Sequence, residues 1–567
     1  MALSQQQILL AEVLANPDDD IPRLVYADYL EDSGDPRGVF IRAQCHLAKS
    51  DFLEPEYYDW LEQSSILLRE HGGQWAEEIK QDLRKSEFHR GFIEKVTVLA
   101  SALVKDEGAI FNQTPINWMR LNRVKGKGEA IANLESLSRL RGLDISGIRI
   151  PFEDMAAILN SDHLTQLKGL KTIAYNSEFG AEECRALADS KAAKTLSHLE
   201  LIGYPQNLES ICSGAGFPSL THLTIQTDLD NEEQVNTLAG LKNLEAKKLE
   251  SLTLAMTLNP TDISGLESSQ WKRLKNLNIH DSVLVDGFLT NLVDTGTFES
   301  LEKFQIEMCE LPQSELELLF NGENFKNCHE LNLQMVTDDL ANELMPIISS
   351  DTQEQFLSQF PEIERLIEKA GNHKELKNLK RFKISHLPSG KLATLLKPGN
   401  LDQLESLTIW SSLLSEEDIA ALSESPLSKN LKSFQLAMVD IIPEGIRRLE
   451  KTEFPNLIHA QFGSGYDHFS LLPHEAIQRL LSGNTFQTLK YLNLDWVNLS
   501  LSKLAASANL PDLRMVSQQN TRGVQKEVKA LLESDRFEKL FKLKMTGSFA
   551  AKDSERLQNK FGPKLEI

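Results

Sequence analysis

A short apolar pattern that recurs along most of the chain constrains the fold more than any other feature. The pattern is Leu-x-x-Leu-x-Leu, with Ile, Phe, Met, Ala or Cys as occasional substitutes. Sixteen copies lie mostly 24 to 30 residues apart, an interval typical of solenoid repeats. Clear copies begin at Leu140, Leu196, Leu220, Leu249, Leu274, Leu301, Leu379, Leu404, Leu431 and Leu489, and weaker ones at Ile116, Leu170, Cys328, Leu457, Leu510 and Leu540.

Each copy predicts a strand followed by a helix. Residues two apart in an extended strand face the same side, so the second and third apolar positions are expected to be buried together. Helical spacing follows, as where Ser415 and Asp418 form a capping box before Ile419 and Leu422. Phe152, Met155, Ile158 and Leu159 show the same spacing after Pro151. The chain is therefore predicted to be an α/β solenoid with a parallel concave sheet and convex helices.

This pattern resembles the leucine-rich-repeat family, and the long period resembles its ribonuclease-inhibitor type. The resemblance covers about 430 of the 567 residues. One interval, from Cys328 to Leu379, spans 51 residues, and an irregular or inserted helical segment is expected near 338–378. Its amphipathic part, Asp351 to Ala370, is either a degenerate repeat or an inserted helix. Packing of its apolar face on the solenoid is favoured over an exposed partner-binding helix.

The first 50 residues predict a small all-α module. Ser4 and Gln7 form a capping box for a helix that ends before Asn16-Pro17. Asp20 is expected to cap a second helix that carries Leu24, Val25, Tyr29 and Leu30, and Asp35-Pro36 is expected to open a third.

The string NPDDDIPRLVYADYLEDSGDPRGVFIRAQ (16–44) resembles a short helical domain of planctomycete proteins, the Gemmata-type repeat-companion domain. HRGFIEKVTV (89–98) and TPINWMRLNRV (114–124) look like that family's bridge into leucine-rich repeats, and ERLQNKFGPKLEI resembles its usual ending. The resemblance implies residues 1–50 as the repeat-companion motif, 51–115 as a helical connector and cap, and 116–567 as repeats. It implies a bacterial source and no established biochemical activity.

Six acidic residues in this module raise the question of a cation site. Structural roles are favoured because the acids stand mostly where helices begin and lack the spacing of a calcium loop. Arg23 and Arg37 are expected to pair with them in surface ion pairs. The six are Asp18, Asp19, Asp20, Asp28, Asp32 and Asp35.

Motifs of catalysis and of cofactor or metal binding are absent from the sequence. The five cysteines are scattered without Cys-x-x-Cys spacing, which indicates a reducing compartment rather than disulfides or zinc. Cys328 occupies an apolar repeat position and is expected to be a core residue. Lys125-Gly-Lys-Gly128 is interpreted as a plain loop. A non-enzymatic protein without cofactor or metal is therefore predicted.

The third, fifth and seventh residues of each repeat are expected to face solvent on the concave side. Many are amides, hydroxyls or histidines, which suit hydrogen bonding to a protein or peptide. Trp410 and Tyr491 are interpreted as possible binding anchors, with packing against neighbouring strands as the alternative. The candidate partner-binding residues are His198, Glu200, Gln226, Asn276, Asn278, His280, Gln305, Asn332, Gln334, Lys383, Trp410, Gln435, Tyr491 and Asn493.

The formal net charge of −22 is unevenly distributed. Residues 1–115 hold 11 basic and 21 acidic residues, a net of −10, whereas the 48 predicted concave positions hold seven basic and six acidic residues. An acidic chain disfavours nucleic acid and anionic membranes as partners. No signal peptide or apolar span is recognised, so a cytoplasmic monomer that binds a protein or peptide is expected. The alternatives are an adaptor or effector linked to an enzymatic activity, and a structural paralogue without a fixed partner.

Overall fold

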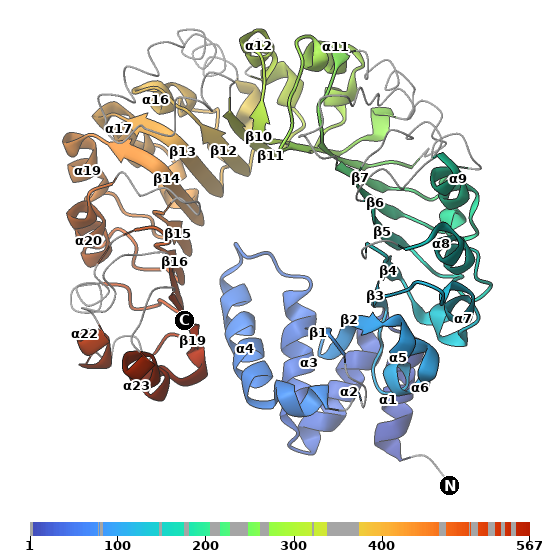
Figure 1. Cartoon of the computed structure of the whole chain (residues 1–567). Helices are drawn as coiled ribbons and strands as arrows, with labels where there is room; N and C mark the ends of the chain where they lie inside the picture. Colours follow the sequence, from blue (N-terminus) through green and yellow to red (C-terminus); the bar gives the residue numbers. More distant parts are fainter. Residues whose placement is uncertain are drawn as a thin grey trace. The chain divides into compact units, whose positions relative to one another are not determined.

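A computed structural model of the chain divides into two compact units, Met1–Ser300 and Leu301–Ile567. Each unit is described by itself (Figure 1). The structure describes residues 4–77, 79, 83–146, 150–174, 181–203, 216–226, 248–260, 271–319, 322–336, 374–463, 472–497, 499, 509–519, 528–533, 539–545 and 551–566.

The first unit begins with four helices and continues as alternating strands and short helices. The helices are α1 (Gln5–Ala15), α2 (Asp20–Asp32), α3 (Pro36–Leu47), α4 (Pro55–Ala76), α5 (Ala100–Lys105), α6 (Gly108–Phe111), α7 (Gly128–Ala132), α8 (Phe152–Leu159), α9 (Ala181–Asp189) and α11 (Phe288–Asp294). The strands are β1 (Lys85–His89), β2 (Phe92–Leu99), β3 (Trp118–Asn122), β4 (Gly142–Asp144), β5 (Gly169–Ala174), β6 (His198–Gly203), β7 (His222–Gln226), β8 (Ser251–Ala255) and β9 (Asn276–His280).

The second unit repeats the alternation of strand and helix. Its strands are β10 (Lys303–Glu310), β11 (Glu330–Val336), β12 (Arg381–Ser385), β13 (Ser406–Leu414), β14 (Ser433–Ile441), β15 (His459–Gln461), β16 (Tyr491–Asn493), β17 (Met515–Gln518), β18 (Lys542–Met545) and β19 (Leu565–Glu566). Its helices are α12 (Leu316–Leu319), α16 (Lys391–Leu395), α17 (Glu416–Glu424), α18 (Leu427–Asn430), α19 (Pro443–Leu449), α20 (His474–Ser482), α22 (Val528–Glu533) and α23 (Ala551–Phe561).

Strand pairing confirms the predicted α/β solenoid. In the first unit β1 pairs antiparallel with β2, and β2 to β9 pair in parallel, each with the next. In the second unit β10 to β19 pair in parallel in chain order. Within each unit the repeat strands line one side and the short helices that follow them lie on the other side, whereas α1 to α4 stand at the N-terminal end of the strand row (Figure 1). The apolar repeat positions form the core between these two layers.

Two weak repeats begin three residues away from the predicted start. Leu170 aligns with Leu143 of the neighbouring strand, so its repeat begins at Leu167 rather than at Leu170. Val516 aligns in the same way with Leu492, which places the start at Leu513 rather than at Leu510. Both errors share one cause: a polar side chain, Thr172 or Gln518, is buried at the third apolar position and breaks the pattern.

The repeat array also begins earlier than predicted. Strand β2 already carries the pattern in buried Ile93, Val96 and Val98, and it pairs in parallel with β3. The 51–115 connector, expected to be helical, therefore contains β1 and β2 beside its helices. Of the irregular segment near 338–378, only residues from 374 onward are described, and the predicted amphipathic helix lies outside the described residues.

A left-handed residue follows the strand face at the eighth position of many repeats. Seven non-glycine residues there have φ between 45° and 65°. Non-glycine residues adopt this conformation at a cost of about 1 kcal/mol or more, so its recurrence marks a turn that the repeat itself requires. In β10 this residue, Met308, lies at a register shift in the pairing with β11, and between β13 and β14 the pairing skips Ser411 and Met438 and then resumes in the same register. The seven are Arg123, Asp281, Met308, His386, Ser411, Met438 and Trp496.

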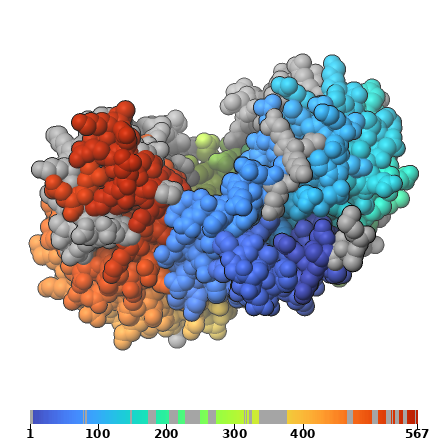
Figure 2. All heavy atoms as spheres, turned by 90° about the horizontal axis from the view of Figure 1, so that it is seen from below, coloured from blue at the N-terminus to red at the C-terminus, as the bar shows by residue number. Residues whose placement is uncertain are grey.

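The N-terminal helices agree with the sequence except in α2. The capping box of Ser4 with Gln7 and the cap of α3 by Asp35 are confirmed. Asp19, not Asp20, caps α2, because its carboxylate accepts from the backbone N–H of Ile21. Val25, one of the four apolar residues named on this helix, is 47% exposed. Figure 2 shows the module as a continuous blue surface.

The capping box of α17 offers a test of local helix stability. Ser415 Oγ accepts from Asp418 N–H at 3.1 Å, and buried Asp418 accepts in return from Ser415 N–H at 2.8 Å. Ser415→Ala is expected to lower the free energy of unfolding by about 1 kcal/mol, since one backbone donor loses its partner. Urea unfolding measures this loss. Ser415→Thr, which keeps a hydroxyl that accepts from the Asp418 N–H and donates to the Asp418 carboxylate, should recover most of it, and equal losses in both variants would contradict the assigned cap.

Candidate functional site

The third, fifth and seventh repeat positions form one face of each sheet, called here the strand face. In β7 and β9 these positions are half-buried and alternate with fully buried Leu and Ile. This alternation confirms the inward and outward register read from the sequence.

Five uncharged polar side chains on β7, β8 and β9 form an amide patch in the first unit: Thr224, Gln226, Thr253, Asn276 and Asn278. Parallel pairing places Thr224, Thr253 and Asn278 in one row across the three strands. All five are half-buried, and none has a side-chain hydrogen bond in the part of the chain that the structure describes. These donors and acceptors are therefore available to a bound molecule.

The other predicted residues of the first unit already interact within the chain. The rings of His198 and His222 stack at 4.1 Å, and burial, with the charge of His222, lowers the pKa of His198. Glu200 pairs with Lys171 at 2.6 Å. His280 lies 2.9 Å from the carboxylate of Asp281.

In the second unit, Glu307 is the centre of a polar network on the strand face. Its carboxylate pairs with Lys383 Nζ at 3.0 Å and accepts from Asn332 Nδ2 at 3.2 Å. Gln305 donates to Glu330 at 2.9 Å. Asn332 and Gln334 are only 6% and 1% exposed, so these two predicted binding residues are part of the core. The Asn332 amide is already hydrogen-bonded to Glu307, and the Gln334 amide is buried, so neither is accessible to a partner.

Two interpretations of Trp410 were predicted, an exposed binding anchor and packing against neighbouring strands, and the structure does not show an exposed anchor. Trp410 is 7% exposed and its ring meets the edge of His386 at 5.7 Å, so the packing alternative holds. Its register neighbours are Ser385 and Ala437. Small side chains on both sides leave room for the indole to lie against the sheet.

Tyr491 and its neighbours are also held in place by the chain. The Tyr491 ring stacks on His459 at 4.7 Å, and burial together with the Asp495 carboxylate raises the pKa of Tyr491 to about 12. Asn493 accepts from the backbone N–H of Asp495 at 2.8 Å. Gln435 donates to Ser433 at 3.2 Å. Of the predicted binding residues, the structure thus brings together Gln226, Asn276 and Asn278 with open hydrogen-bonding groups.

The acidic module contains an ion network that the sequence did not predict. Arg23, fully buried, pairs with Glu94 of β2 at 2.7 Å rather than with the module's own acids. Burial raises the pKa of Glu94, but the hydrogen bond from His89 and the charges of Arg23 and Arg90 outweigh it and hold that pKa below its usual value. Asp20 pairs with Lys49 at 2.7 Å and with Arg90 at 3.1 Å.

Two more of these acids, and Arg37, also interact within the chain. Asp18 pairs with Arg141 at 3.0 Å, and Asp28 pairs with Arg42. The Arg37 guanidinium lies over the Phe92 ring at 5.1 Å. The sequence did not reveal the pairing of Glu94 with Arg23 because the two residues lie far apart along the chain.

The other sequence features considered for chemistry, Cys328 and the Lys125–Gly128 loop, have structural roles. Cys328 is buried as expected, and burial raises the pKa of its thiol to about 12, far from that of a nucleophile. In the Lys125–Gly128 loop, the N–H groups of Gly126 and Gly128 both donate to Asp154 at 2.7 Å. Within the described residues, no group of three or more His, Cys, Asp or Glu side chains could hold a metal.

No helix in the described part of the chain is both long and apolar enough to cross a bilayer.

No protein family profile and no curated protein matches the chain. Among solved structures, the chain is similar to the yeast Rad7–Elc1 complex at 13% identity and a TM-score of 0.38, over 98% of this chain and 96% of that one. It is similar to the TLR13–ssRNA13 complex at 15% identity and a TM-score of 0.32, over 78% of this chain and 64% of that one. A Bacteroides fragilis protein is similar at 14% identity and a TM-score of 0.26, over 58% of this chain and 76% of that one. The fold assignment rests on the strand pairing of this chain.

Proposed function

We propose that the chain is a non-enzymatic scaffold that binds a protein or peptide partner on the strand face of its solenoid. The observation that supports this is the amide patch: five half-buried polar side chains on three adjacent strands, none of them hydrogen-bonded within the described chain. Amides and hydroxyls both donate and accept, which matches the N–H and C=O groups of a peptide. A rigid repeat scaffold holds such groups without reorganisation on binding.

The lack of charge in the amide patch distinguishes this mode of binding from electrostatic capture. Its five members carry no formal charge. The dissociation constant of a partner is therefore expected to change less than about threefold between about 0.05 M and about 0.3 M salt.

The test compares the wild-type chain with the triple variant Gln226→Ala, Asn276→Ala, Asn278→Ala. Partners are captured from the native lysate after nuclease digestion, identified, purified and titrated. The triple variant is expected to weaken binding at least about tenfold, because several hydrogen bonds worth roughly 0.5–1.5 kcal/mol each are lost. It should fold normally, since no internal bond is removed.

The matched control removes two Asn and one Gln side chain elsewhere: Asn133→Ala, Asn484→Ala and Gln487→Ala, all exposed. It should bind like the wild type. Equal binding by both triple variants would overturn the assignment of the amide patch. A partner lost on nuclease digestion would indicate nucleic acid as the ligand and overturn the proposal.

A further inference from the structure

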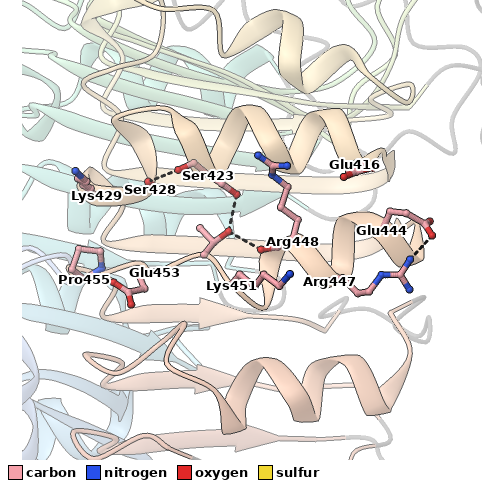
Figure 3. A pocket seen from close by; sticks show the side chains of 11 residues that line it. Glu416, Ser423, Ser428, Lys429, Glu444, Arg447, Arg448, Lys451, Glu453 and Pro455 are labelled. Atoms are coloured by element: carbon pink, nitrogen blue, oxygen red, sulfur yellow. Dashed lines mark hydrogen bonds and ion pairs between the residues drawn. The ribbon is translucent and has the colours of Figure 1, made fainter.

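A groove lies on the helical side of the second unit, between α17 with α18 and α19 (Figure 3). Its cavity volume is about 670 Å³. At one end Gly445 lets α19 approach α17, because a Cβ there would stand only 3.2 Å from the Ser415 carbonyl oxygen. Along the groove, Ser423 and Thr452 join its two walls by a hydrogen bond between their hydroxyls at 2.7 Å.

Four basic side chains line this groove: Lys429, Arg447, Arg448 and Lys451. Three acidic side chains also line it, so its net charge is positive in a chain whose total is −22. Arg447 pairs with Glu444, and Arg448 pairs with Glu424 outside the lining. No carboxylate of the described chain lies within ion-pair distance of the Lys429 or Lys451 ammonium group.

The two arginine pairs are exchangeable. The side chains of Arg447 and Glu444 are 62% and 50% exposed, and Glu424 is 70% exposed. Ion pairs of this exposure stabilise a protein by about 0–1 kcal/mol, so an incoming carboxylate can replace Glu444 or Glu424 at little cost. Four cations are thereby available: two lysines directly and two arginines by exchange of partner.

We propose that this groove binds an acidic peptide segment, with its carboxylates on Lys429, Arg448 and Lys451. The volume lies within the range of protein ligand sites, and it accommodates several residues rather than one ion. The cations come from two helices and the loop after α19 instead of converging on one point, which suits charges spaced along a peptide. Arginine forks match carboxylates in geometry, and lysines add point charge. This site goes beyond the proposed function because it lies on the helices, not on the strand face.

The probe is unlabelled decaglutamate, titrated calorimetrically into the full chain. The chain as a whole repels a polyanion, so measurable binding requires a local basic site. Binding is expected at about 0.05 M salt and should weaken at least about tenfold at about 0.3 M. Absence of binding at low salt overturns the proposal, and the bases then serve only to complement the carboxyl-terminal ends of α18 and α19.

The double variant Lys429→Gln, Lys451→Gln is expected to weaken decaglutamate binding at least about fivefold. The matched control Lys125→Gln, Lys272→Gln changes the net charge equally at exposed sites of the other unit and should bind within about twofold of wild type. Circular dichroism checks that both variants are folded. An equal loss in both variants overturns the groove assignment, because only total charge would then matter. The amide-patch triple variant should bind decaglutamate normally, which separates the two proposals.

Discussion

Glu94→Gln is expected to lower the free energy of unfolding by about 3–5 kcal/mol, the largest effect of any single change considered. Glu94 is 3% exposed, and its two oxygens contact Arg23, Arg90, His89 and Asn117 at 2.7 to 3.3 Å. The amide keeps the shape of the side chain but removes its charge. Arg23, which is fully buried, then keeps a positive charge without its compensating carboxylate. Urea unfolding of the full chain, followed by circular dichroism, measures the loss.

Two further variants test the cause of this loss. Glu87→Gln removes an exposed ion pair between Glu87 and Lys85, both in β1, the strand beside β2. The Lys85 and Glu87 side chains are 70% and 47% exposed, so the variant should lower the free energy of unfolding by less than about 1 kcal/mol. Adding Arg23→Met to Glu94→Gln should lose less stability than the two single variants summed, because the unpaired charge is gone. Additive losses in the double variant would rule out an ion pair as the stabilising interaction.

The second large effect is a loss of stability in weak acid. Burial lowers the pKa of His386 to about 4 and the pKa of His459 to about 4. In the unfolded chain an imidazole titrates near 6.5. Below about pH 6.5 the unfolded chain therefore binds protons that the folded chain excludes, and stability falls until about pH 4. Between pH 7.5 and pH 5 each imidazole should remove about 2 kcal/mol from the free energy of unfolding.

The measurement is urea unfolding at both pH values. His386→Gln and His459→Gln should each reduce the difference between pH 7.5 and pH 5 by about 2 kcal/mol, whatever they cost at neutral pH. His474→Gln, at an exposed position, is the control and should leave the difference unchanged. If all three variants retained the full difference, the burial of these imidazoles would not be the source of acid sensitivity.

The repeat pattern predicted most of the fold because its signal is local. A strand needs only alternate apolar residues, and copies such as those beginning at Leu274 and Leu404 place every apolar position in the core. Predictions failed where a buried polar side chain replaced an apolar one, as at Thr172, or where two caps competed, as at Asp19 and Asp20. In the second case Asp20 forms ion pairs with Lys49 and Arg90, which are distant from it along the chain.

The sequence by itself determined the solenoid, the strand register of most repeats and the helical N-terminal module, because apolar spacing and caps act over a few residues. Only the tertiary structure decided which polar side chains are available. Asn278 and Asn332 occupy the same fifth position of their repeats, yet Asn278 has no hydrogen bond in the described chain and Asn332 is bound to Glu307. That difference depends on neighbours from other repeats, 25 residues away in the case of Glu307. The same reason hid the Arg23–Glu94 pair, since a buried charge is recognised by its partner and not by its local sequence.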